Sequence, residues 1–536
     1  MQRQGVATTI ERSGTLLSLI PAFWSRVLFP GPAATAGPFR LRPFLLLLLI
    51  SSSLIFGNLS FHLLEPDEGR YAEIPREMLM RGDWVVPYLQ GEPYLDKPPL
   101  LYWLVMISYK AVGIHDWSAR LVPALALEGC ILLTFVFGRR WFGEQAAFWS
   151  SLLLSLAPGF VSVGRLLILD GLLTLWVAAS LFTAYEAIRG GRLRALWWIA
   201  SACACGLGVL TKGPVALLLL FPPCLAYCWL HGQLGRLRWN WLGLYAVVCL
   251  AIPLPWYIAI CIRSPDFARH FLWEHNIVRF VAPFDHLRPI WYYGPILLVG
   301  LLPASLFLGP LAAFLLSSKP ETAAQRSAPL AFTLLAGGWC LLFFSLSGCK
   351  LPTYIMPAFP LLTLACGAYL CQAGWLEGRL VKVSTAVMLV ILFSAHNIML
   401  PWYAGYRAPV GRLAELRDYC AERETPIICY PRHCDSVAFY VGRDDLRGYR
   451  SKQTHLLVRF LQEQPRTVLL LTHRHSLEGL RHALTPDLQL TSTRHFGLGL
   501  LPGLSDNLAQ GVSWMMGETS LGLCDVAVIE RRTPRR

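Results

Sequence analysis

Charged residues are scarce in this chain of 536 residues. Only 15% of the residues are Asp, Glu, Lys or Arg, whereas 55% are hydrophobic and the mean hydropathy is +0.47. A typical soluble domain has about 25% charged residues and lacks repeated apolar runs of membrane-spanning length. The composition therefore excludes a soluble protein and predicts a polytopic membrane protein. Basic cytoplasmic loops account for the net charge of +14, so this charge does not indicate nucleic-acid binding.

Cysteine patterns typical of metal sites and a cleavable leader are also missing. Most of the 15 cysteines lie in or beside apolar runs, and the pair Cys224 and Cys228 lacks partners at zinc spacing. The apolar stretch 16–23 is too short to span a bilayer and no small-residue cleavage site follows it, so residues 1–42 are predicted to form a cytoplasmic arm. Three complete disulfide pairings are open to the four cysteines of the C-terminal region, Cys420, Cys429, Cys434 and Cys524.

Long apolar runs predict eleven membrane spans, each close to the roughly 20 residues that a bilayer requires. An additional pair would raise the number to 13 without changing the sidedness. The run 100–112 is shorter and contains Lys110, so residues 99–114 are predicted to form an interfacial helix. The predicted spans are 43–63, 119–138, 146–164, 171–189, 195–211, 214–231, 241–262, 291–316, 328–346, 351–372 and 381–400.

The basic residues predict the sidedness of these spans. With an interfacial 99–114 helix, the arginine-rich loops at 139–140, 189–194 and 236–238 all fall on the cytoplasmic side. The acidic loop 64–98 then lies outside. The chain is therefore predicted to be a multi-pass protein with a cytoplasmic N-terminus.

Residues 43–400 are predicted to form the transmembrane domain, and residues 401–536 a small extracytoplasmic α/β domain. The composition changes after residue 400, and amphipathic helical segments then alternate with short apolar strands. The predicted helices of this domain are 411–424 and 456–462, and its predicted strands are 426–430, 467–472 and 525–530.

The acidic loop 64–98 is the main candidate for chemistry, because charges beside a membrane core are expensive and usually functional. Taken alone, Asp67 and Asp170 could be helix N-caps and Lys212 an interface anchor. Taken together, carboxylates and fixed cations on one side of the membrane suit a reaction between a lipid-borne phosphate and a polar acceptor. The charged residues predicted on this side are Asp67, Glu68, Arg70, Asp96, Lys97, Asp170, Lys212, Glu274, His275, Arg279 and Lys350.

Three motifs in this loop carry a family resemblance: the run 67–78, the triplet Gly82-Asp83-Trp84 and the tetrapeptide 96–99. They resemble the first external loop of the protein-mannosyltransferase-like superfamily, and in particular of the bacterial lipid A 4-amino-4-deoxy-L-arabinose transferases. These are GT-C glycosyltransferases that use polyprenyl-phosphate sugars. The similarity continues through 165–170, 210–214, 273–280 and 350–357.

The resemblance implies roles for individual residues. Asp67 matches the catalytic carboxylate, with Glu68 beside it. Asp170 and Asp96 match a second acidic site. Some relatives hold a divalent ion nearby, which makes Asp96, Asp170 and His275 candidate metal ligands, although no cofactor is predicted as required. The residues implied to bind the donor phosphate are Lys97, Arg279, Tyr354 and Arg70.

The predicted function is that of an integral-membrane glycosyltransferase in the bacterial inner membrane. It would move a pentose or hexose from a polyprenyl phosphate to an acceptor on the periplasmic face, either lipid A or another cell-envelope glycolipid. Three alternatives remain open: protein O-mannosyltransferase-like transfer, a charged-lipid transporter or flippase, and a membrane-anchored binding protein acting through residues 401–536. Transporters tend to carry ionisable groups near the midplane and internal repeats, and neither is evident in this sequence.

Overall fold

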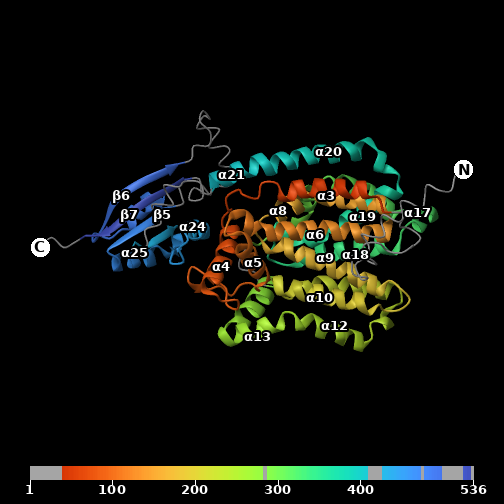
Figure 1. Cartoon of the computed structure of the whole chain (residues 1–536), viewed down its shortest axis with the longest axis horizontal. Helices are drawn as coiled ribbons and strands as arrows, with labels where there is room; N and C mark the ends of the chain where they lie inside the picture. Colours follow the sequence, from red (N-terminus) through yellow and green to blue (C-terminus); the bar gives the residue numbers. More distant parts are fainter. Residues whose placement is uncertain (1–38, 282–285, 408–424, 472–475, 498–522, 533–536) are drawn as a thin grey trace.

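The computed structural model describes residues 39–281, 286–407, 425–471, 476–497 and 523–532. Figure 1 shows a bundle of long helices with a small sheet-containing domain at one end. The short helix α17 (Pro320–Ala324) lies at the opposite end of the bundle. The predicted fold class, a helical polytopic membrane protein with a C-terminal α/β domain, is confirmed.

Every predicted span falls on one helix or on a pair of bent helices. Six helices of the described residues are long and apolar enough to cross a membrane, and nine spans result if each bent pair counts as one. Shorter apolar helices also occur, among them α3, α5 and α11. The bundle helices are α3 (Leu41–Phe56), α6 (Asp116–Phe142), α7 (Glu144–Ser155), α8 (Pro158–Gly164), α9 (Leu169–Ile188), α10 (Ala195–Lys212), α11 (Val215–Leu230), α12 (Trp239–Ala251), α13 (Leu254–Arg263), α15 (Tyr293–Gly300), α16 (Leu308–Leu316), α18 (Ala328–Leu346), α19 (Phe359–Gln372), α20 (Arg379–Ser394) and α21 (Leu400–Arg407).

Proline accompanies each of the three bends. The pair α7 and α8 bends by 57° before Pro158, the pair α12 and α13 by 49° near Pro253, and the segments around α15 and α16 by 107° near Pro303. Proline has no backbone N–H and its ring clashes with the preceding turn, so it breaks or redirects a helix.

The acidic loop forms α4 (Asp67–Arg81), a hairpin and then α5 (Leu100–Val112). Two acids in the first turn of α4 favour a helix N-terminus, and Gly82 ends the helix in a left-handed conformation. Both helices lie at the end of the bundle that faces the C-terminal domain (Figure 1). The hairpin strands are β1 (Tyr88–Leu89) and β2 (Glu92–Pro93). The interfacial position of residues 99–114 stays a prediction.

The C-terminal domain contains a five-stranded sheet in the order β4-β3-β5-β7-β6. Strand β3 is parallel to β4 and β5, whereas β7 runs antiparallel to β5 and β6. Alternate residues of β3 and β5 contribute to two separate apolar cores, as the two faces of a strand require. The elements are β3 (Ile427–Tyr430), α24 (Asp435–Val441), β4 (Arg447–Gly448), α25 (Thr454–Glu463), β5 (Arg466–Leu471), α26 (Ser476–Ala483), β6 (Leu488–Gly497) and β7 (Leu523–Arg531).

Two predictions for this domain involve residues that lie outside the described part of the chain. The predicted helix 411–424 lies there entirely, as does Cys420. Cys429 is a buried thiol in β3. Because each of the three complete pairings uses Cys429, the structure contains none of them.

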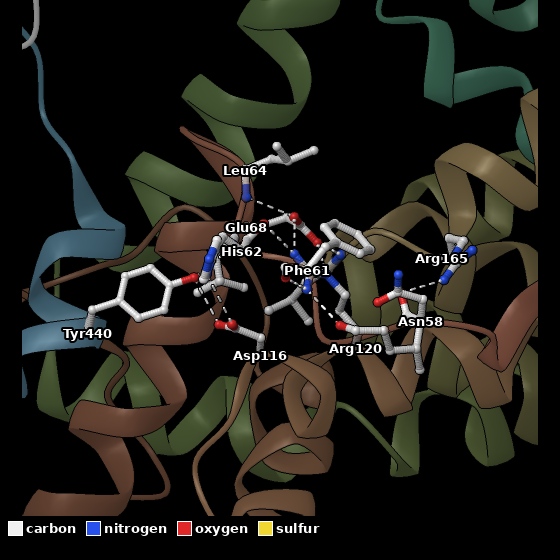
Figure 2. A network of polar contacts seen from close by, with 12 residues as sticks. Asn58, Phe61, His62, Leu64, Glu68, Asp116, Arg120, Arg165 and Tyr440 are labelled. Carbon is white, nitrogen blue, oxygen red and sulfur yellow. Dashed lines mark hydrogen bonds and ion pairs between the residues drawn. The ribbon is translucent and has the colours of Figure 1, made fainter. Parts of the chain in front are cut away.

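Helix α24 docks the C-terminal domain onto the acidic loop. The Tyr440 hydroxyl donates to Asp116 Oδ1 at 2.9 Å and accepts the Leu63 N–H at 2.7 Å (Figure 2). Arg76 Nη2 of α4 donates to the carbonyl of Arg443 at 3.1 Å. The domain is therefore held against the loop that carries Asp67.

Candidate active site

A cavity of about 2400 Å³ opens between the end of the bundle and the C-terminal domain. A site for a drug-sized ligand has a volume of about 300–1,000 Å³, so this cavity can hold two substrates at once. Its walls come from α4, the β1–β2 hairpin, the ends of α9 and α10, the segments η2 (Ala268–Val278) and η5 (Pro352–Ala358), and the C-terminal domain. The predicted site residues that line it are Asp67, Arg70, Asp96, Lys97, Asp170, His275, Arg279 and Tyr354.

Asp67 is the first residue of α4, and its side chain is 56% exposed. The N-cap of this helix is Pro66, and no side-chain cap bond forms, so the alternative of Asp67 as an N-cap is not supported. Asp67 Oδ1 lies 3.6 Å from Arg70 Nη1. The structure thus presents a carboxylate to the cavity with one cation beside it.

Glu68 points away from the cavity, although it follows Asp67 directly. Its carboxylate forms a bidentate pair with Arg120, at 2.7 Å for both oxygens (Figure 2). The backbone N–H groups of Leu64 and Leu167 donate to the same carboxylate at 2.9 and 2.8 Å. Because Glu68 is buried and fully engaged, we assign it a positioning role in place of the predicted catalytic role.

Lys97 is a half-buried cation in the wall of the cavity. Its Nζ donates to the carbonyl of Asp96 at 3.0 Å. Burial lowers the pKa of the Lys97 ammonium to about 8, and the nearby charges of Lys212 and Arg279 act in the same direction. Three cations thus converge on one part of the cavity wall, and an anionic group bound there would relieve their mutual repulsion.

Asp170 forms an ion pair with one of these cations. Its Oδ1 lies 2.5 Å from Lys212 Nζ, which in turn lies 4.5 Å from the centre of the Tyr354 ring. The N-cap of α9 is Ile168, so the alternative of Asp170 as an N-cap is not supported. Asp170 therefore fixes Lys212 beside Tyr354.

The candidate metal ligands are only partly those predicted. The ligand atoms of Asp96, His270 and His275 all lie within 4.8 Å of one another, whereas Asp170 pairs with Lys212. His270 Nε2 lies 2.8 Å and His275 Nε2 3.4 Å from Asp96 Oδ1. One carboxylate and two imidazoles fit a zinc-type ion, and burial lowers the pKa of His275, which favours the neutral, metal-binding form.

His270 was not predicted as a ligand, because its proximity to His275 depends on the local helix type. Residues 268–278 form a π-helix, in which the i→i+5 hydrogen bond brings residues five apart onto one face. The five-residue spacing of His270 and His275 fits this geometry and not an α-helix. The hydrogen-bonding pattern, and not the amino-acid composition, therefore creates the pair.

The C-terminal domain supplies a wall of the cavity that no motif predicted. Glu65 and Asp435 lie on this side, and a set of basic residues surrounds them. The exposed basic residues on this wall are Arg432, His433, Arg447, Arg450 and Lys452.

The chain is similar in sequence to known membrane glycosyltransferases. Residues 42–271 match the model of the dolichyl-phosphate-mannose-protein mannosyltransferase family. The chain is 38% identical over 337 residues to undecaprenyl phosphate-alpha-4-amino-4-deoxy-L-arabinose arabinosyl transferase 2 of Pseudomonas fluorescens, a match that covers 61% of this chain and 56% of that protein. It is 37% identical over 383 residues to the protein of the same name from Sodalis glossinidius, covering 68% and 66%. The matched region thus spans less than two thirds of these relatives' own length.

A solved structure matches almost the whole chain. The crystal structure of ArnT from Cupriavidus metallidurans bound to undecaprenyl phosphate superposes with a TM-score of 0.70 at 21% identity. The match covers 90% of this chain and 97% of that one. It includes the C-terminal part, and at this level of identity it establishes the shared fold.

Proposed function

We propose that this chain is an integral-membrane glycosyltransferase, because residues 42–271 match the model of the dolichyl-phosphate-mannose-protein mannosyltransferase family and the chain shares the fold of ArnT. It transfers a sugar from a polyprenyl phosphate to an acceptor on the outer face of the bacterial inner membrane. The observation that carries this proposal is the cavity itself, in which the half-exposed Asp67 shares one space with the half-buried cation Lys97.

The membrane side of the cavity suits the donor. Lys97 and Arg279 neutralise the phosphate while the bond from the sugar anomeric carbon to the phosphate oxygen breaks, and the electron pair leaves with the phosphate. The Tyr354 hydroxyl, which lines the same cavity, would donate a hydrogen bond to this phosphate. Apolar side chains continue this wall and suit the polyprenyl chain; they include Leu218, Phe343 and Phe344.

The opposite wall suits an anionic acceptor. Exposed cations from the C-terminal domain, including Arg450 and Lys452, face the cavity there. We therefore favour a phosphate of lipid A or of another envelope glycolipid as the acceptor. Such a phosphate is already ionised and attacks without a general base. Asp67 would then stabilise the positive charge that grows on the sugar ring in the transition state.

The sidedness is proposed from the convergence of basic loops at one end. Buried Glu186 accepts ion pairs from Arg140, Arg189 and Arg194, so the loops 139–140 and 189–194 meet. Arg236 donates to the carbonyl of Ile188 at 3.0 Å and joins the same cluster. Basic residues gather on cytoplasmic loops, which supports a cytoplasmic N-terminus and a periplasmic C-terminal domain.

Mass spectrometry of lipid A, other glycolipids and glycoproteins from cells with and without the gene tests this function. We expect one envelope lipid to lose the mass of a single sugar in the deletion strain and to regain it when the wild-type gene returns. Purified protein should also release polyprenyl phosphate from the donor when that lipid is added. Unchanged lipids and no release would contradict the proposal, and loss of a protein glycan would favour protein O-glycosylation.

The donor affinity is expected to depend on pH through Lys97. The Lys97 cation is present below its pKa of about 8 and is lost above it, so affinity for the donor should fall as the pH rises from 7 to 9. We expect about a tenfold increase in the donor Kd at pH 9, because roughly one tenth of the ammonium then remains charged. The donor is a phosphodiester and keeps a single negative charge over this range.

Lys97→Arg is the matched control for this pH effect. Arginine stays charged up to a pKa above about 12, so the variant should bind the donor with an affinity that hardly changes between pH 7 and 9. Titration of the donor against both proteins by intrinsic fluorescence measures the two profiles. Identical pH dependence in both proteins would show that another group is responsible.

A further inference from the structure

The C-terminal domain places one buried acid against the acidic loop. Asp435 begins α24, and its side chain is only 3% exposed. Its Oδ1 accepts a hydrogen bond from Gln90 Nε2 at 2.9 Å, and its Oδ2 lies 3.4 Å from Arg70 Nε. Because Arg70 Nη1 also lies 3.6 Å from Asp67 Oδ1, one guanidinium joins Asp67 to the C-terminal domain.

A second buried acid lies beside Asp435. Glu65 Oε1 accepts the backbone N–H of Ser436 at 2.5 Å, whereas Glu65 Oε2 is buried with no hydrogen-bond partner among the described residues. Burial raises the pKa of Glu65 to about 8, and the neighbouring charge of Asp435 acts in the same direction. Burial also raises the pKa of Asp435, whereas the charge of Arg70 and its hydrogen bond lower it. Of the two acids, Asp435 is the one whose carboxylate lies against the Arg70 guanidinium, at 3.4 Å.

We propose that Asp435 is a positioning residue of the transfer site, because it draws Arg70 away from Asp67 and leaves the Asp67 carboxylate open to the cavity. The inference rests on the proposed function and makes the C-terminal domain part of the site. Without the charge of Asp435, Arg70 would turn to its remaining carboxylate and form a bidentate pair with Asp67. Such a pair would neutralise the charge that the transition state needs.

The same interface contains contacts that serve docking alone. Tyr440 binds Asp116, and Arg76 binds the carbonyl of Arg443. Neither contact reaches Asp67. Asp435 differs from them because its ionic partner, Arg70, is also the ionic partner of Asp67.

Asp435→Asn tests the inference, with Asp444→Asn as its matched control. Asp444 belongs to the same domain and faces Arg81 of α4 at 3.9 Å, but its side chain is 64% exposed. We expect Asp435→Asn to lower kcat by roughly ten- to a hundredfold with little change in the donor KM, since a small misplacement of a reacting group has effects of this size. Asp444→Asn should keep the wild-type kcat.

The melting temperature separates positioning from simple docking. Asn can still accept the hydrogen bond from Gln90, and its neutral amide removes the cost of burying the Asp435 charge. We therefore expect Asp435→Asn to melt at or above the wild-type temperature while its kcat falls. A parallel fall of melting temperature and kcat would overturn the inference in favour of a docking role, as would a wild-type kcat.

A double-mutant cycle shows whether Asp435 acts through Arg70. In an Arg70→Lys background, which keeps the charge but loses the guanidinium fork, the added Asp435→Asn change should alter kcat much less than it does in the wild type. An equal loss in both backgrounds would overturn the inference. The proposed function fails separately, if the wild-type protein releases no polyprenyl phosphate from the donor.

Discussion

Asp67→Asn is expected to lower kcat by roughly 10²- to 10⁴-fold, the range over which a positioned carboxylate contributes to a transition state. The substitution keeps the shape of the side chain and removes its charge. Because Asp67 is half-exposed and its ion pair with Arg70 spans 3.6 Å, the fold should be little affected. We expect a change of less than about 0.5 kcal/mol in the free energy of unfolding.

Release of polyprenyl phosphate from the donor measures this effect, with Asp266→Asn as the control. Asp266 is an exposed acid that follows α13, and Arg263 of α13 pairs with Asp83 of the acidic loop at 2.8 Å. The control therefore removes one negative charge near the same loop without touching the cavity wall. Wild-type turnover in Asp67→Asn would remove Asp67 from the reaction and leave Asp170 as the next candidate.

The sequence was sufficient to predict the helical fold, because a lipid bilayer requires long apolar helices. Each predicted range contains a helix or a bent pair, even where the apolar run continues through a bend. The 107° bend near Pro303 was not predicted, because residues 291–316 form one continuous apolar run in the sequence. A proline in an apolar run can kink a helix or end it, and packing against the neighbouring helices decides between the two.

The candidate site was predicted only where its residues lie in the segments that carry the family resemblance. Asp67 and Lys97 belong to one loop, and the motif around them pointed to both. Asp435 and Glu65 meet only because α24 packs on α4, and no local pattern in either segment indicates the other. Long-range packing of this kind has no signal in a single sequence.

Neighbouring acids in one motif can also have different roles. Successive residues of an α-helix point about 100° apart, so when Asp67 faces the cavity, Glu68 must face elsewhere. It faces Arg120, which lies in α6 and was not among the residues singled out from the sequence. The motif thus indicated both acids as candidates. Only the orientation of the helix distinguishes the exposed carboxylate of Asp67 from the buried carboxylate of Glu68.

Arg120→Met is expected to destabilise the protein by about 3–5 kcal/mol, because it leaves the buried carboxylate of Glu68 without its cation. Arg120 is 0% exposed, and Figure 2 shows it beside Glu68 among the carbonyl groups of the preceding loop. It donates to the carbonyls of Leu59 and His62 at 2.9 and 3.1 Å, and also to that of Phe61. The loop that leads into α4 is therefore organised around this one side chain.

The melting temperature of detergent-solubilised protein, followed by tryptophan fluorescence, measures this destabilisation. Arg459→Met is the control, because Arg459 is an exposed residue of α25 with a surface ion pair to Glu463 at 3.9 Å. Such a pair contributes less than about 1 kcal/mol, so the control should melt close to the wild type. Equal melting of all three proteins would contradict a supporting role for the Glu68–Arg120 pair. An Arg120→Met protein that is stable but inactive would instead favour a catalytic role for Glu68. The expected loss of stability would show that Glu68 supports the loop that holds Asp67.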